Sequence, residues 1–277
     1  LFRSVSTAGD IVFAGHSERY SRKKNDADIC TELMQEIFGM NIGTVAYYER
    51  PWLKQLRQWY AGQGVEWNKI TTCQILRQQL RPFFLGGVKV QSFNHHLSHA
   101  AGGFQTSPFD RATVVVIDAI GEWDTISIWG AEYDSSGRAV YKKLWRQRYP
   151  HSIGLFYSAV TQRVGLHPLD EEYITMGMSA YGNDNYHHVM ESVLVRDADE
   201  IEFGVNLHTG VDENFMSGLD HVDIAASAQQ LLERLIGNIM RRARDFEWST
   251  NLVYQGGVAL NCLANRNLGE YFDNIWI

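Results

Sequence analysis

The sequence predicts an α/β fold, and three features of the 277-residue chain indicate it. Segments with the pattern of strands alternate with segments whose apolar residues recur at helical spacing. Residues 113–147 read as three strands separated by the turn-rich segments GEWD and DSSG, which predicts an antiparallel meander. A short apolar strand at 251–255 runs directly into GGVALN and another helix. A meander followed by helices and a strand–Gly-Gly–helix unit suits a nucleotide-binding lobe.

The segments on either side of the meander follow the same alternation. Before it, we expect a strand running into a loop at 11–21, a helix at 31–38, a strand at 44–49, amphipathic helices over 52–80 and a strand at 88–93. Asn94 can cap a helix over HHLSHAAGGF, because its side chain can accept a hydrogen bond from the first turn. After the meander, helices dominate from Ser152, residues 225–246 form the strongest amphipathic helix, and the last residues read as a strand.

Composition excludes several classes of protein. Apolar residues make up 45% and charged residues 21% of the chain, which excludes disordered and fibrous proteins. The net charge of −7 gives no support for a nucleic-acid partner. No apolar run approaches the roughly 18 residues that span a bilayer. Three scattered cysteines encode neither a disulfide framework nor a zinc knuckle. We therefore expect a cytoplasmic protein with no membrane partner, and the composition argues against a nucleic-acid partner.

His95 and His99 form a candidate metal site. Their i, i+4 spacing on the predicted helix stacks both imidazoles on one face, close enough to share a metal ion. Asp118 ends the apolar strand VVVID, where a carboxylate is costly unless it is paired or binds a metal. Two histidines and one carboxylate leave coordination positions open, as catalytic iron and zinc sites do. The alternative is that the histidines are surface or core residues; an HExxH protease is excluded, because position 96 is His.

Three loops are candidates for contacts with phosphate or nucleotide. AIGEWDT (119–125) follows the strand, and its backbone N–H groups can approach phosphate oxygens, although a plain hairpin turn would use similar residues. GGVALN (256–261) places two glycines between a strand and a helix, which brings main-chain donors against a nucleotide; a tight turn between strand and helix is the alternative. ERYSRKKND (18–26) concentrates basic residues that suit an anion of the phosphate or carbamoyl-phosphate type, or a solvated charged loop.

Six blocks of sequence together resemble the O-carbamoyltransferase family known from nodulation-factor and antibiotic biosynthesis. They occur in the family's order and cover the chain from about residue 11 to its end. The blocks are ERYSRKKND, HHLSHAAGGF, VVVIDAIGEWDT, SIGLFYSAVTQRVGL, MGMSAYG and GGVALNCLANRNL.

The resemblance implies an actin-like, sugar-kinase-type ATPase fold of two related α/β lobes, similar to the tRNA threonylcarbamoyl-transfer proteins. It implies a divalent metal, usually iron with zinc or manganese as alternatives, that is held by His95, His99, Asp118 and a later aspartate of a DAG-type motif. That motif should follow shortly after Ile277. The segment that usually reads Glu-Gly-Lys is Glu172-Tyr173-Ile174 here, so the family's lysine is lost.

The resemblance also implies roles for the three loops. Lys24 matches the family's basic position and should contact a phosphate or carbonyl oxygen. The nucleoside of an adenylate should be held by Gly256, Gly257 and Asn261. The phosphate side of the cleft should be lined by Gly121, Glu122 and Thr125.

The expected function is the transfer of a carbamoyl group to a hydroxyl of a small-molecule or sugar-like acceptor. The donor would be carbamoyl-adenylate, which the family makes from ATP and carbamoyl phosphate. Asp118 and Lys24 are the candidate catalytic residues, and a homodimer is compatible with the sequence. Two alternatives stay open. One is threonylcarbamoyl transfer to tRNA, although the negative net charge of the chain argues against it. The other is a non-catalytic nucleotide-binding module that needs a partner.

We expect the chain to be a fragment of the family's transfer domain. Residues 1–110 would form the first lobe without its start, and residues 111–277 the second lobe without its end. The domain that forms carbamoyl-adenylate is expected to be absent from these 277 residues.

Overall fold

A computed structural model describes residues 2–23, 35, 42–79 and 88–277 of the chain. The chain divides into two compact units, 1–93 and 94–277. The boundary differs from the expected division after residue 110, because helix α5 (His95–Phe104) packs on the sheet of the second unit. The expected assignment of the two lobes stays a prediction. Each unit is described separately.

The described residues of the first unit form two small sheets and several helices. Strands β1 (Phe2–Val5) and β2 (Ile11–Gly15) pair antiparallel, and β3 (Thr44–Tyr47) pairs parallel with β4 (Lys89–Ser92). Its helices are α1 (Ser17–Ser21), α3 (Pro51–Tyr60), η1 (Trp67–Lys69) and α4 (Thr72–Gln79). For the strand running into a loop that was expected at 11–21, the strand is confirmed as β2, but the expected loop was wrong because Ser17–Ser21 form α1. Apart from residue 35, the helix expected at 31–38 lies outside the described residues.

A five-stranded mixed sheet forms the centre of the second unit, in the order β11-β10-β5-β6-β7. Strands β5 (Arg111–Gly121), β6 (Asp124–Tyr133) and β7 (Ala139–Arg148) form the predicted antiparallel meander. Strands β10 (Asn251–Gln255) and β11 (Asn274–Trp276) extend it with parallel pairing. The chain is therefore an α/β protein, as predicted.

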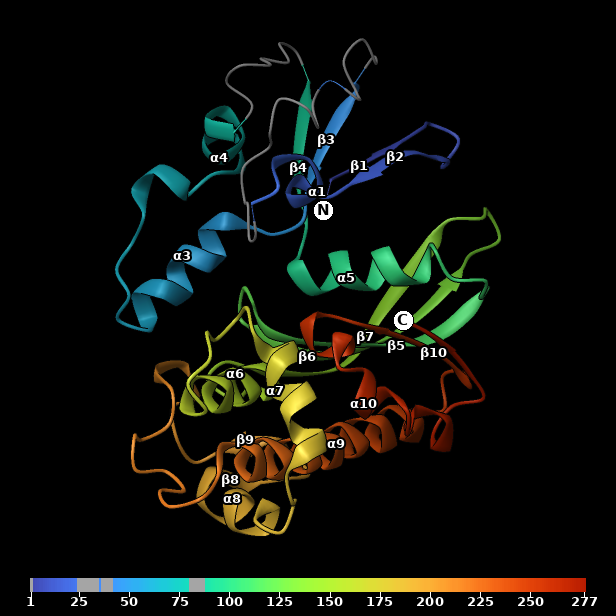
Figure 1. Cartoon of the computed structure of the whole chain (residues 1–277). Coiled ribbons are helices and arrows are strands. Elements are labelled where there is room, and N and C mark those ends of the chain that lie inside the picture. The colour runs from blue at the N-terminus through green and yellow to red at the C-terminus, as the bar shows by residue number, and fades with distance from the viewer. Residues whose placement is uncertain (1, 24–34, 36–41, 80–87) are drawn as a thin grey trace. The chain divides into compact units, whose positions relative to one another are not determined.

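Helices cover both faces of this sheet (Figure 1). Helix α5 packs on one face over β5, β6 and β10, where Ala100, Phe104, Val114, Val116 and Trp129 contribute to a small apolar core. The larger core lies on the other face. Helices on that side are α6 (Ile153–Arg163), α7 (Glu172–Met178), α8 (His187–Leu194) and α9 (His221–Asp245).

The second unit also contains several short strands and helices, some of which differ from the elements predicted from the sequence. Strands β8 (Val195–Asp197) and β9 (Glu202–Phe203) form a small hairpin within the segment expected to be helical. After β10 the chain forms the 3-10 helix η5 (Gly257–Leu260) and the four-residue helix α10 (Cys262–Asn265), rather than entering a regular helix directly. Further 3-10 turns are η3 (Ser179–Tyr181), η4 (Leu207–Thr209) and η6 (Leu268–Glu270). No helix in the described part of the chain is long and apolar enough to span a membrane.

Candidate metal site

The first turn of α5 presents the two candidate histidines. Asn94 has extended backbone angles, and its side-chain oxygen accepts a hydrogen bond from the amide of Leu97 at 3.0 Å, which confirms the predicted N-cap. The helix that starts there places His95 and His99 one turn apart on the same face. Local sequence therefore sets the separation of the two imidazoles.

Asp118 comes from the facing strand β5. Side chains alternate along a strand, so Asp118 lies on the same face as Val114 and Val116, which pack against α5. The pairing of β5 with β6 shifts register between Ile117 and Gly121, so the regular ladder stops next to Asp118. Asp118 thus lies three residues before the end of β5, and its carboxylate contacts His95 in the first turn of α5.

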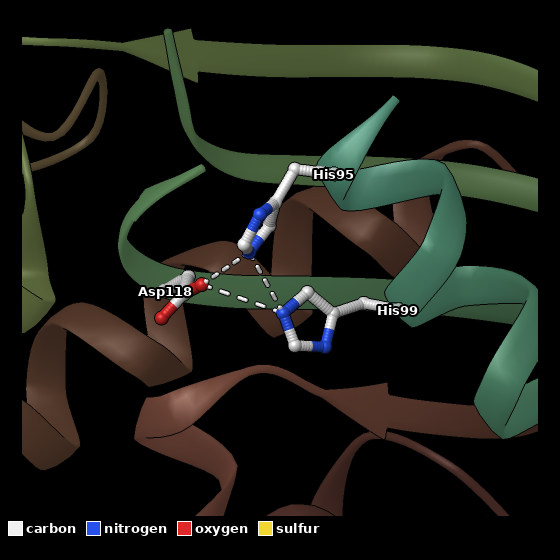
Figure 2. Close-up of side chains that lie close together, drawn as sticks. All are labelled: His95, His99 and Asp118. Atoms are coloured by element: carbon white, nitrogen blue, oxygen red, sulfur yellow. Dashed lines mark hydrogen bonds and ion pairs between the residues drawn. The ribbon is translucent and has the colours of Figure 1, made fainter. Parts of the chain in front are cut away.

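Three ligand atoms converge at this point (Figure 2). His95 Nε2 lies 3.0 Å from Asp118 Oδ2, and His99 Nε2 lies 3.4 Å from the same oxygen. The two Nε2 atoms are 3.1 Å apart. The exposed fractions of the three side chains, 12%, 33% and 19%, leave the cluster reachable from solvent. Two imidazole nitrogens and one carboxylate oxygen, all within 4.8 Å of one another, fit the donor set of a divalent transition metal.

The electrostatics of Asp118 suit a metal ligand. Burial alone would raise the pKa of its carboxyl, but hydrogen bonds from His95 and His99 and their charges hold that pKa well below its ordinary value. Asp118 is therefore ionised at neutral pH, which is the form that binds a cation. By contrast, burial lowers the pKa of His96 to about 3, so its imidazole is neutral.

A cavity of about 350 Å³ opens beside Asp118 within the second unit. Tyr157 donates a hydrogen bond to Gln229 Oε1 at 2.8 Å, and the amides of Gln229 and Asn261 bond to each other at 2.9 and 3.0 Å. This network fixes one wall. The lining residues are Asp118, Ala119, Gly154, Tyr157, Ser158, Leu169, Asp170, Glu172, Tyr173, Met176, Leu232, Gly257, Val258, Leu260 and Asn261.

The Gly-Gly turn lies between this cavity and the sheet. Gly256 has a φ of +99°, and a Cβ there would lie 2.2 Å from the carbonyl oxygen of Ile117, so only glycine fits. A Cβ at Gly257 would lie 3.1 Å from Asp118 Oδ1. Asn261 is 8% exposed, and its side-chain oxygen also accepts from the amide of Ala264. Of the three residues expected to hold a nucleoside, Gly257 and Asn261 thus line the cavity with Asp118.

The residues expected to line a phosphate site have other surroundings. A Cβ at Gly121 would lie 2.6 Å from the rings of both His95 and His96. Glu122 accepts a hydrogen bond from Asn94 Nδ2 at 3.0 Å. Thr125 is fully buried and donates to the carbonyl oxygen of His151 at 2.5 Å.

None of these three residues is among those lining the cavity, and their phosphate role stays a prediction. Lys24 lies outside the described residues. Ile174, at the position of the family's lysine, is half-buried and does not line the cavity either.

Sequence reasoning missed much of the cavity wall. Ser158 donates to Glu172 Oε1 at 2.5 Å, and the same oxygen accepts from the amide of Leu169. Leu169 has a φ of +63°, a strained value for a branched aliphatic residue. These residues come from α6, α7 and the loop between them, and no local spacing marks them as partners of Asp118.

The fold and the site together define an α/β lobe with a candidate metal centre at the end of a central strand, next to a cavity. Residues 68–277 match the family described as carbamoyltransferase N-terminus, and the chain belongs to this family, as the resemblance predicted; five of the six blocks lie in the matched range. All three candidate ligands lie in the matched range.

Individual relatives are longer than this chain. The uncharacterized protein sll1178 of Synechocystis sp. is 31% identical, over 97% of this chain and 51% of its own length. Nodulation protein NolO of Bradyrhizobium diazoefficiens is 27% identical, over 66% of this chain and 35% of its own length. Nodulation protein NolNO of Sinorhizobium fredii is 27% identical, over 68% of this chain and 29% of its own length. The chain thus spans about half or less of the length of these relatives.

Proposed function

We propose that this chain is the transfer part of an O-carbamoyltransferase. It would move a carbamoyl group from carbamoyl-adenylate, made from ATP and carbamoyl phosphate, to a hydroxyl of a small-molecule or sugar-like acceptor. The acceptor oxygen would bond to the carbamoyl carbon, the bond from that carbon to the adenylate oxygen would break, AMP would leave, and the hydroxyl proton would pass to a base. The convergence of His95, His99 and Asp118 beside a cavity, in a member of the carbamoyltransferase family, carries this proposal.

An actin-like ATPase fold is part of the proposal. The meander β5–β6–β7, extended by the parallel strands β10 and β11, supports it. The turn after β10 brings Gly257 and Asn261 to the cavity, where the nucleoside of an adenylate would bind.

A divalent metal would be held by His95, His99 and Asp118, with iron as the expected ion. When bound, it would act as a Lewis acid that polarises the carbamoyl carbonyl. Asp118 holds both imidazoles through Oδ2, while its Oδ1 accepts from the amide of Ala119 at 2.8 Å. Because these contacts come from a strand and a helix rather than a loop, the ligands keep their geometry before a substrate arrives. The cavity beside them would orient the acceptor and limit access of water.

The change Asp118→Asn tests this function. Asparagine keeps the shape and one oxygen but removes the negative charge. We expect single-turnover transfer from supplied carbamoyl-adenylate to fall by at least about 10²-fold, or roughly 2.7 kcal/mol of transition-state stabilisation. Binding of the nucleotide, measured by calorimetry, should change much less because Gly257 and Asn261 lie on a separate turn.

A matched control is Asp134→Asn. Asp134 pairs with Arg138 at 3.3 Å in the turn between β6 and β7, and it does not line the cavity. The folded control should transfer near the wild-type rate, with circular dichroism to verify folding. A folded Asp118→Asn protein with the wild-type rate would show that this carboxylate is structural and the proposed mechanism wrong.

A further inference from the structure

His96 lies between the two proposed ligands along α5, but its side chain contacts the central sheet rather than Asp118. Its side chain is fully buried, and its ring centroid lies 6.1 Å from that of His95 and 6.4 Å from that of His99. Its Nδ1 lies 2.7 Å from the hydroxyl oxygen of Ser127 on β6, which is also fully buried. This contact joins the first turn of α5 to a strand of the central sheet.

Ser127 is itself held in place. The indole N–H of Trp129 donates to the Ser127 hydroxyl oxygen at 2.7 Å. An indole can only donate, so the hydroxyl oxygen is the acceptor there and its proton can go to His96 Nδ1. The ammonium of Lys143 lies over the Trp129 ring, 4.6 Å from its centroid, and bonds to Asp124. A chain of contacts thus runs from the sheet to the histidine.

The backbone at the β5–β6 turn packs against the rings of both His95 and His96. A Cβ at Gly121 would lie 2.6 Å from Cδ2 of both His95 and His96. The two rings therefore pack against the same short stretch of backbone, and a displacement of one imidazole would change the space available to the other. The orientation of the His95 ring depends on where the His96 ring sits.

Packing alone does not favour an imidazole at this position. Within the described residues, Nε2 of His96 is buried with no hydrogen-bond partner. A buried polar atom without a partner is energetically unfavourable, and an apolar side chain of similar size would avoid that penalty. The contribution of the imidazole is therefore its directional bond to Ser127.

We propose that His96 is a positioning residue, which through Ser127 fixes the first turn of α5 so that His95 and His99 face Asp118. This inference rests on the proposed metal site. Side chains that orient metal ligands typically change metal affinity by about 10–100-fold when they are replaced. His96 would act in this way without contacting the ion.

Binding of Co²⁺ tests the proposal, because its visible absorption spectrum reports ligand geometry as well as affinity. The purified protein is treated with a chelator and titrated with Co²⁺ alone. We expect Ser127→Ala and His96→Leu to weaken Co²⁺ binding by about 10–100-fold and to alter the spectrum. His96→Asn places an acceptor where Nδ1 lies, so it should restore affinity and spectrum toward the wild type.

Two further variants separate the possible failures. Thr113→Val removes another buried hydroxyl of this sheet, which donates to the carbonyl oxygen of Ser249 at 3.1 Å, and it should lower stability without changing Co²⁺ binding. His95→Ala should abolish binding. Wild-type affinity and spectrum in Ser127→Ala, and in His96→Leu where it folds, would overturn the role of His96. Unchanged binding in His95→Ala would instead show that the proposed metal site is wrong.

Discussion

Asp118 connects the candidate metal site to the cavity through its two carboxylate oxygens. Oδ2 contacts the imidazoles of His95 and His99 at 3.0 and 3.4 Å. Oδ1 accepts a hydrogen bond from the amide of Ala119. The same oxygen lies next to Gly257, where a Cβ would come within 3.1 Å of it. A substitution in the metal site or in the cavity wall would therefore displace the same carboxylate. This residue couples ligand geometry to the shape of the cavity.

The ionisation of Asp118 should make the stability of the metal-free protein depend on pH. Its pKa in the folded protein lies below the ordinary value of 3.8, because hydrogen bonds to the histidines outweigh burial. Between the two values the unfolded chain binds more protons, so stability rises with pH there. The contribution is fully present above the unfolded pKa and is lost as the pH falls through the folded pKa.

Urea unfolding of the wild type and of Asp118→Asn, in the presence of a chelator, measures this effect. We expect the difference in free energy of unfolding to be greatest at pH 5 and above, roughly one unit over the unfolded pKa, and to shrink on acidification. A difference that stays constant with pH would contradict the depressed pKa.

At the scale of elements, the turn from β10 into η5 combines two glycines with different constraints. Gly256 has backbone angles that L-residues rarely adopt, and its Cα faces the carbonyl of Ile117. Gly257 has no positive φ and faces a carboxylate instead of backbone. One glycine thus serves the fold, and the other leaves room for Asp118.

Alanine at each glycine should separate these roles. Gly256→Ala combines a strained φ with a clash against backbone, and we expect it to destabilise the protein by about 1–3 kcal/mol or more, measured by urea unfolding. Gly257→Ala should change stability little but weaken Co²⁺ binding, because its Cβ presses on Asp118 Oδ1. Equal losses of stability in both variants, with unchanged Co²⁺ binding, would show that both glycines serve only the turn.

The elements with strong local patterns could be predicted from the sequence. The meander, α5 with its Asn94 cap, and α9 follow from alternation, capping and helical spacing. The hairpin of β8 and β9 was missed because strands of three and two residues are too short to show a period. A helix was predicted after the two glycines that follow β10, where the chain forms the short helices η5 and α10, because two glycines mark a turn without fixing the type or length of the helix after it.

The candidate site was predictable only in part, for a similar reason. The spacing of His95 and His99 and the apolar strand before Asp118 are local features, and the structure brings these residues together. Thr125, which was expected to line a phosphate site, lies on β6, and its hydroxyl donates to the carbonyl oxygen of a residue 26 positions away. The bond between His96 and Ser127 spans 31 residues. Contacts of this kind depend on tertiary packing, which no local spacing encodes.

At the scale of the whole molecule, the described core is concentrated in one unit. Both apolar cores, the three candidate ligands and the cavity lining all belong to residues 94–277. Among the described residues of the other unit, Pro51 and Leu76 are the buried apolar side chains. The family match also covers all of the second unit but only part of the first.

We therefore expect residues 94–277 to fold cooperatively as a separate protein and to bind Co²⁺ as the whole chain does. Burial of apolar surface is the main source of folding free energy. Among the described residues, both clusters of buried apolar side chains lie in this unit. Circular dichroism during urea unfolding would measure folding, and a Co²⁺ titration would measure the site. His95→Ala in the same shortened protein provides the control for specific binding. A shortened protein that unfolds without cooperativity, or one that folds but binds Co²⁺ much more weakly than the whole chain, would show that residues 1–93 contribute to the core or to the site.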